Sequence, residues 1–486
     1  MILSRGYGWG YSELRPYLWA LAAGIIIGAA SFISPFLGLG VVALVVVFYA
    51  SLSRPVVLLC LYTLAVVLLS GMPRNLLIPL LVPNEPLLAL TIGLGTIIIL
   101  MTNAGRQSRE KIAPIIIVAI VLYFVGTSLL PMLVYLMRGW RFSIAEMFNL
   151  LAPIQYLLLF WLYAQLPRNA EERLTVLHFM VFCSSIVSIT GLLQAANFGP
   201  MLSILQQFYP SIHLSQAAES GRITAILNSW NSLGNFLFIN LVLILSIAGL
   251  RRGFLWNLNL GVALLLNVAC LLGSGSFASI GGLVLAVAIT KYFDRRGLKL
   301  LMWLIGICIL AAIILYPIIS MRLEYQFGGP GNSGTPQTLA YRFYLWENIF
   351  LPALAKDNGY VWGISPLLNS GIFTWAWTEN QYLFLLIRSG LVSLIAHTAW
   401  VMMTLIWLRR LMKGGQEIQR VLAVVVFALL ITLTIMGMTN EVFTNSGSMD
   451  YLWILMGLTA KGGDSIANSK PKHAIVPAAA TANETG

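Results

Sequence analysis

The chain consists mainly of long apolar runs separated by short polar segments, between Pro16 and Leu458. Many runs contain 16 to 23 residues, and a helix needs about 20 residues to cross the hydrocarbon core of a bilayer. Backbone groups in lipid must bond to one another, which restricts spanning structures to helices and closed barrels. The runs lack the strict alternation of barrel strands. The pattern therefore predicts an all-α polytopic membrane protein.

We expect about fourteen transmembrane helices. The first two runs fit either two spans or one element bent at Pro35, and the last run is short enough to be tilted or re-entrant. The expected spans are 17–33, 36–51, 55–70, 87–101, 113–132, 148–164, 174–193, 228–250, 254–272, 277–291, 300–320, 381–407, 421–439 and 449–460.

The charge distribution predicts the orientation. Only 9% of the residues are charged and the net charge is +12, whereas soluble domains carry about 25% charged residues. With the N-terminus inside, the inner segments hold 21 of the 29 lysines and arginines and the outer segments hold eight. The positive-inside rule favours this arrangement, with both termini cytoplasmic. It also explains the basic charge without a nucleic-acid partner.

The polar segments predict where chemistry takes place. Two longer outer loops, 194–227 and 321–380, contrast with short inner turns. We expect an integral membrane domain over 1–460 and a disordered cytoplasmic tail over 461–486, which is rich in Ala, Asn, Thr and Lys. No cleavable signal peptide is expected, because the first apolar run continues into a second. The cysteines and histidines show no metal-ligand spacing, so neither a metal nor a cofactor is expected.

Arginines in the outer segments are candidates for chemistry, because the topology rule does not account for them. Arg222 follows a polar loop and opens a span. Arg342 lies on a predicted short amphipathic helix, one turn before Trp346 on the same face. A guanidinium group binds phosphate oxygens in pairs and keeps its charge. Several arginines at a membrane surface therefore favour a phosphate or pyrophosphate ligand.

Two further charged residues lie at the start of one late span. Arg388 follows Asn380 by two helical turns. A buried arginine either faces a polar cavity or an anion, or forms a salt bridge within the bundle, for which Asp450 and Glu441 are the partners. Glu379 lies near the outer water boundary. It is either a general base toward a hydroxyl group or an acid favoured by the helix dipole.

Four stretches across about residues 220–390 carry a family resemblance. The first, 221–234, has an Arg followed by an Asn-x-Asn-like element, and the second, 272–276, contains a Gly-Ser-Gly-Ser turn. The third, 342–363, has an Arg-x-x-x-Trp element and a Gly-x-Gly-like turn, and the fourth, 379–390, has Glu-Asn-x-x-Leu and a later Gly. In this order they resemble the O-antigen ligase and Wzy-type polysaccharide polymerase superfamily. The second stretch lacks the family's Arg, and Glu379 stands where the ligases commonly have His.

The resemblance implies a GT-C-like fold in the bacterial inner membrane, with a periplasmic loop of short amphipathic helices. It implies metal-independent, inverting glycosyl transfer from undecaprenyl pyrophosphate-linked glycan to a hydroxyl of another repeat unit. Replacement of the His favours a polymerase of exopolysaccharide or O-antigen over a ligase. In this interpretation the catalytic residues are Glu379, Arg222 and Arg342. The substrate-binding residues are Arg388, Asn231, Trp346, Asn380 and Tyr382.

Other functions remain open at this stage. A ligase would transfer the glycan to lipid A-core or protein. A lipid-glycan flippase or transporter belongs to another class, and such proteins often contain internal repeats, of which none is convincing here. A peptidoglycan polymerase of the SEDS type would need an outer aspartate, and Asp357 is the only one in the long loop. The expected partners of a polymerase are the bilayer, a flippase and a chain-length regulator.

Overall fold

The computed structural model confirms an all-helical protein, because 83% of the described residues are helical and none of them forms a strand. The predicted spans 17–33 and 300–320, most of 36–51, and the tail 461–486 lie wholly or largely outside the described residues. The structure describes 49–51, 54–74, 76, 82–103, 112–139, 144–211, 214, 221–227, 229–250, 253–294, single positions between 301 and 327, 336–356, 358–365 and 378–460.

Seven helices in this part of the chain are long and apolar enough to cross a membrane: α4, α5 with its continuation to Met137, α9, α12, α13, α20 and α21. Two shorter apolar helices, α3 and α14, lie among them. This is the composition of a helical membrane protein, and the total of fourteen spans stays a prediction. The bounds are α3 (Pro55–Leu69), α4 (Asn84–Asn103), α5 (Pro114–Phe124), α6 (Leu130–Met137), α7 (Ile144–Leu151), α8 (Ile154–Gln165), α9 (Ala170–Ala195), α10 (Gly199–Phe208), α12 (Trp230–Ile247), α13 (Phe254–Ser274), α14 (Phe277–Phe293), α17 (Gln337–Leu345), α18 (Leu351–Ala355), α19 (Gly359–Trp362), α20 (Gln381–Gly414), α21 (Glu417–Met436) and α22 (Ser446–Ala460).

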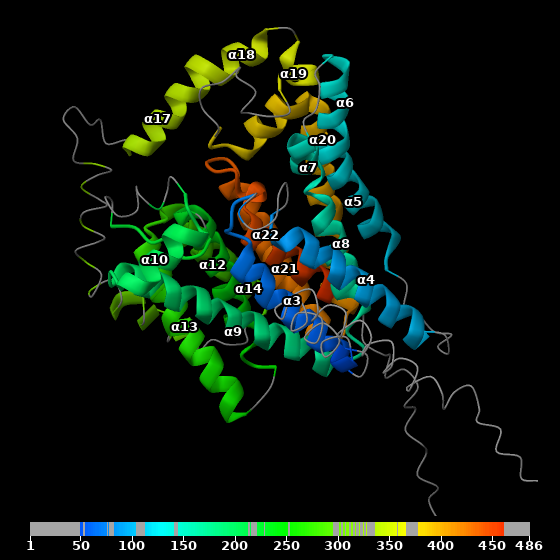
Figure 1. Cartoon of the computed structure of the whole chain (residues 1–486), viewed down its shortest axis with the longest axis vertical. Coiled ribbons are helices and arrows are strands. Elements are labelled where there is room, and N and C mark those ends of the chain that lie inside the picture. The colour runs from blue at the N-terminus through cyan, green and yellow to red at the C-terminus, as the bar shows by residue number, and fades with distance from the viewer. Residues whose placement is uncertain are drawn as a thin grey trace, which may run out of the picture.

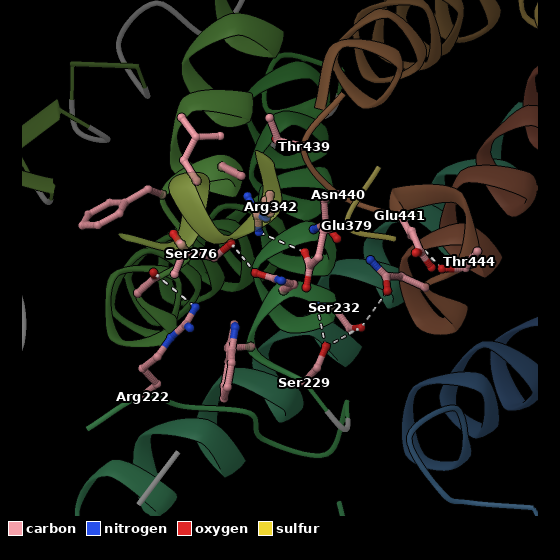
Figure 2. Close-up of a pocket in the computed structure, with 18 of the residues that line it drawn as sticks. Arg222, Ser229, Ser232, Ser276, Arg342, Glu379, Thr439, Asn440, Glu441 and Thr444 are labelled. Atoms are coloured by element: carbon pink, nitrogen blue, oxygen red, sulfur yellow. Dashed lines mark hydrogen bonds and ion pairs between the residues drawn. The ribbon is translucent and has the colours of Figure 1, made fainter. Parts of the chain in front are cut away.

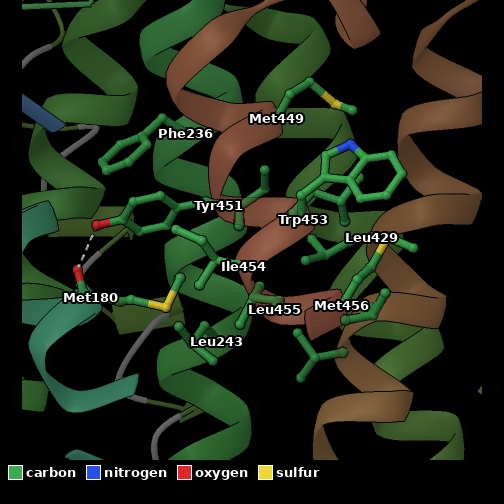
Figure 3. Close-up of a cluster of buried hydrophobic side chains, with 14 of the residues drawn as sticks. Met180, Phe236, Leu243, Leu429, Met449, Tyr451, Trp453, Ile454, Leu455 and Met456 are labelled. Atoms are coloured by element: carbon green, nitrogen blue, oxygen red, sulfur yellow. Dashed lines mark hydrogen bonds between the residues drawn. The ribbon is translucent and has the colours of Figure 1, made fainter. Parts of the chain in front are cut away.

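Helix α22 is the centre of the bundle (Figure 1), where it packs against α8, α12 and α21. Every residue from Gly447 to Ala460 is buried. Tyr451 donates a hydrogen bond of 3.2 Å to the carbonyl of Met180, and its ring lies 4.7 Å from that of Phe236 (Figure 3). A mainly apolar helix without a polar face is stable only when protein or lipid surrounds it. Protein encloses α22, so its 15 residues do not need to match the thickness of the bilayer.

The predicted span 148–164 is two helices, because the chain turns at Pro153 between α7 and α8. Proline lacks the N–H that a continuous helix needs and clashes with the preceding turn. The π-helical segment Val125–Leu129 similarly joins α5 to α6, and there Ser393 donates a hydrogen bond to the carbonyl of Gly126. The turn at Pro153 divides one apolar run into two helices, whereas the π-helical segment keeps the other continuous from Pro114 to Met137.

The segment 336–365 forms an arm of short helices, α17 to α19, at the top of Figure 1. It confirms the expected short helix around Arg342, which α17 contains. The arm packs on the start of α20 through its own small apolar core. This core consists of Leu345, Phe350, Leu354, Leu383 and Ile387.

A kink in α20 joins the arm to the bundle. Ser389 and Gly390 leave helical geometry, with φ of +71° at Gly390. The kink allows the carbonyl of Ile387 to accept hydrogen bonds from the N–H groups of Ile364 and Ser365 at 2.7 and 3.1 Å. A Cβ at Gly390 would lie 2.0 Å from the carbonyl oxygen of Val361. The close approach and the positive φ both require glycine.

We predict that Gly390→Ala lowers the melting temperature of the detergent-solubilised protein. The unfavourable backbone conformation alone costs about 1–3 kcal/mol, and the clash with Val361 adds to it. Gly261→Ala is the matched control, because Gly261 lies on α13 with no atom within 4 Å of its added Cβ. An unchanged melting temperature of Gly390→Ala would contradict the proposed docking of the arm at the kink.

Candidate active site

A cavity of about 620 Å³ lies at the end of the bundle beneath the arm (Figure 2). Its volume is typical of sites for small molecules. The N-termini of α12, α14 and α22 border it, together with the segment before α20 and the loop after α21. The lining residues are Ser70, Arg222, Leu227, Ser229, Trp230, Asn231, Ser232, Gly275, Ser276, Phe277, Ala278, Phe327, Pro336, Thr338, Leu339, Tyr341, Arg342, Glu379, Thr439, Asn440, Glu441, Thr444, Asn445 and Ser446.

Arg222 is buried in one wall of the cavity. It donates hydrogen bonds of 3.0 Å to the carbonyl of Ser274 and 3.3 Å to that of Gly275. Its guanidinium carbon lies 3.9 Å from the centre of the Trp230 ring. A cation over an indole face is favourable, and the two carbonyls belong to the C-terminal end of α13, where a positive charge is favoured. These contacts fix the guanidinium group at the cavity.

Hydroxyl and amide groups continue this wall. Ser276, at the N-cap of α14, donates a hydrogen bond of 3.3 Å to Asn231. It also lies 2.9 Å from the hydroxyl of Ser279, which donates to Asn235. The stretches 221–234 and 272–276, which are separate motifs in the sequence, therefore meet at one wall of the cavity.

Arg342 reaches the cavity from the arm. It donates a hydrogen bond of 3.0 Å to Glu379, with which it forms an ion pair. Trp346, one turn later, donates a hydrogen bond of 2.7 Å to the carbonyl of Thr378. Glu379 has φ of +52°, a strained conformation for a residue with a side chain. Contacts from the arm to two adjacent residues help to hold this turn in place.

Glu441 is a second carboxylate of the cavity, and it is only 4% exposed. It accepts hydrogen bonds of 2.5 Å from both the backbone N–H and the hydroxyl of Thr378. Burial raises the pKa of Glu441 to about 7, and the neighbouring Glu379 adds to this rise, while the hydrogen bonds from Thr378 oppose it. A carboxyl group that titrates near neutral pH is suited to proton transfer.

Four of the eight sequence-predicted site residues line this cavity: Arg222, Arg342, Glu379 and Asn231. The other four lie outside its lining. Trp346 supports the turn at Thr378, as described above. Asn380 caps α20, because its side chain accepts from the N–H groups of Tyr382 and Leu383 and donates to the carbonyl of Met438. Tyr382 donates a hydrogen bond of 2.5 Å to the carbonyl of Thr434.

Arg388 lies inside the bundle on α20, with its guanidinium carbon 5.1 Å from the centre of the Phe384 ring. Its Nε atom is buried without a hydrogen-bond partner. Within the described part of the chain, it forms an ion pair with neither Asp450 nor Glu441. The sequence motifs placed Arg388 among the substrate-binding residues, but its side chain is not part of the cavity wall.

The sequence pattern indicates Glu441 only as an ion-pair partner for Arg388. The signal that marks it is its position, because it is a single acid in the short segment between two apolar runs. Such a segment at a helix end brings a carboxylate to the border of the membrane. Its proximity to Thr378, 63 residues earlier, depends on the fold.

We predict that Glu441→Gln stabilises the protein increasingly as the pH rises. The raised pKa means that the folded protein binds a proton that the unfolded chain releases. The stability from this proton is fully present below about pH 4.5 and is lost as the pH rises through about 7. Gln stays neutral, so its melting temperature relative to wild type should rise between pH 5 and 8. A difference that is independent of pH would show that Glu441 does not titrate in this range.

Comparison of the chain with models of known protein families finds no match, and comparison with curated proteins finds none either. The functional assignment therefore depends on the geometry of the cavity and on the motifs that converge there.

Proposed function

We propose that this protein transfers a glycan from a lipid pyrophosphate carrier to a hydroxyl group at the cavity. The observation that carries the proposal is the meeting of Arg222 and Arg342, 120 positions apart in the chain, at one cavity where three helix N-termini converge. Helix N-termini and guanidinium groups both favour anions, and a pyrophosphate carries several negative charges. The carrier is undecaprenyl pyrophosphate in the interpretation that the sequence motifs favour.

The restraint of both arginines supports this role. Arg222 is fixed by the carbonyls of the α13–α14 turn and by Trp230, and Arg342 is fixed by Glu379. Charges that are already oriented need little reorganisation when negative charge develops on the leaving pyrophosphate. The hydroxyl and amide groups of Ser276 and Asn231 are suited to hydrogen bonding with sugars.

The proposed reaction is an inverting displacement. The acceptor oxygen forms a bond to the anomeric carbon, the bond from that carbon to the pyrophosphate oxygen breaks, and its electron pair leaves with the pyrophosphate. The acceptor hydroxyl loses its proton to a base of the cavity. Because pyrophosphate is a good leaving group, the protein contributes mainly orientation and charge stabilisation.

The charges at the other end of the bundle support a periplasmic cavity. Arg54 precedes α3, Lys291 is in the last turn of α14, and Arg409, Lys413 and Arg420 lie around the α20–α21 turn. All these positions are at the helix ends opposite the cavity. The positive-inside rule assigns that end to the cytoplasm, which leaves the cavity at the outer face of the inner membrane.

We expect single cysteines at the two ends to label from opposite sides. Asn348→Cys places an exposed thiol on the arm, and Lys413→Cys places one at the opposite end. A membrane-impermeant thiol reagent added to cells with a permeabilised outer membrane should label only Asn348→Cys. The wild-type chain, whose four cysteines lie in the apolar runs, gives the background. Labelling of Lys413→Cys alone would reverse the orientation.

We expect Arg222→Ala and Arg342→Ala each to lower glycan transfer at least about 30-fold, because loss of a buried charged contact costs about 2–5 kcal/mol. Lysine at either position should restore little activity, because it cannot bind two oxygens in a fork. The assay measures undecaprenyl pyrophosphate released by purified protein from lipid-linked glycan, in the presence of lipid A-core and envelope proteins as further acceptors, all extracted from cells that lack the protein.

Arg410→Ala is the matched control, since Arg410 is exposed at the opposite end of α20. Membrane protein levels are compared for all variants. Full activity of Arg222→Ala and Arg342→Ala would place the pyrophosphate elsewhere. Products that lengthen by whole repeat units identify a polymerase, and transfer to lipid A-core or protein alone identifies a ligase, the alternative within this class.

A further inference from the structure

The two carboxylates of the cavity differ in their partners. Glu379 faces a positive charge, because Arg342 is paired with it at 3.0 Å. Glu441 accepts hydrogen bonds from the N–H and the hydroxyl of Thr378 and a backbone hydrogen bond from Glu379, which are all neutral donors. Burial among neutral groups strengthens the Glu441 carboxylate as a proton acceptor.

The position of Glu441 is fixed by the segments on both sides of it. Gly437 accepts a hydrogen bond of 2.8 Å from the N–H of Gln381, and Phe443 donates one of 3.1 Å to the side chain of Gln381. The loop that carries Glu441 is therefore bound to the first turn of α20 before and after this residue. A carboxylate held in this way has a fixed position and is pre-organised for contact with a bound substrate.

We propose that Glu441, rather than Glu379, is the base that accepts the proton of the attacking hydroxyl, and that Glu379 positions Arg342. This inference rests on the proposed function. As the acceptor oxygen bonds to the anomeric carbon, its proton passes to the Glu441 carboxylate. The electron pair of the broken glycosidic bond leaves on the pyrophosphate. The protonated Glu441 then returns its proton to water before the next cycle.

The charged and titratable groups around Glu441 determine how it responds to pH. Glu379 lies beside it at the turn before α20, and its negative charge favours the protonated form of Glu441. Arg342 pairs with Glu379 and limits this effect. Arg388 on α20 interacts electrostatically with Glu441. His397, also on α20, packs on Phe443 of the same loop, with ring centres 4.9 Å apart.

The test is the pH profile of undecaprenyl pyrophosphate release between pH 5.5 and 8.5, with the same extracted lipid-linked glycan. Wild-type activity should rise with pH around a midpoint near 7, the pKa of Glu441, because a base must be deprotonated. Glu441→Gln should lower kcat at least about 100-fold and abolish this rise, with KM changed less than threefold. Gln still accepts hydrogen bonds from Thr378, so a merely structural role would preserve the wild-type profile.

Glu379→Gln separates the two carboxylates. It removes a negative charge beside Glu441, so the rise should remain and its midpoint should move to lower pH. Glu347→Gln is the matched control, because Glu347 is an exposed acid of the arm outside the cavity lining, and its profile should equal that of wild type.

Each outcome has a defined meaning. A wild-type rate and profile in Glu441→Gln would overturn this inference while leaving the proposed function intact. Loss of the rise in Glu379→Gln, with its retention in Glu441→Gln, would make Glu379 the base. If the wild-type protein releases no undecaprenyl pyrophosphate from the glycan while the folded protein is intact, the proposed function and this inference both fail.

Discussion

The contact between Glu441 and Thr378 joins the parts of the cavity that lie far apart in the sequence. The carboxylate bonds to the turn before α20, and Trp346 of the arm bonds to the carbonyl of the same Thr378. The adjacent Glu379 pairs with Arg342. The arm, the start of α20 and the loop after α21 thus meet at two consecutive residues. A buried backbone N–H needs a hydrogen-bond partner. The partner of the Thr378 N–H is the carboxylate of Glu441, a group that can also bind a proton.

The enclosure of α22 explains why this contact lies at a helix end. All its residues after Ser446 are buried among apolar neighbours, so its length offers little room for polar chemistry. The polar groups collect where the helices end, at Ser446, at Ser276 and at Ser229, each of which borders the cavity. In a bundle surrounded by lipid, these ends are where side-chain donors meet water.

The sequence predicted the helical class and several boundaries because both are local. Helix α14 begins at Phe277 and α20 at Gln381, the positions where the apolar runs begin. The number of spans depends on tertiary packing, because hydropathy does not distinguish a helix that faces lipid from one that is enclosed by protein. The enclosed α22 is the clearest example. The span 148–164 was expected to be continuous because apolar residues lie on both sides of Pro153, but proline disfavours a continuous helix and the chain breaks there.

The candidate site shows the same division. Arg222 and Arg342 were predicted because the topology rule does not account for arginines in segments expected outside, and Glu379 because it lies at the start of a span; all three border the cavity. The position of a charged residue in the sequence does not predict the direction in which its side chain points from the helix. Tyr382 follows Asn380 by two residues and points to Thr434, and Arg388 stacks on Phe384 within the bundle. Charge identifies which residues are unusual, but packing decides where they point.

The charged groups of the cavity differ in the partners that hold them. Arg222 is held by carbonyl dipoles and an indole ring at one wall of the cavity. Arg342 shares its charge with Glu379. Glu441 has neutral donors and deep burial, so it is the carboxylate whose proton balance responds to a nearby change of charge. An anion bound at the arginines would raise its proton affinity further. In the proposed reaction, binding of the pyrophosphate and the proton affinity of Glu441 would therefore be coupled by electrostatics.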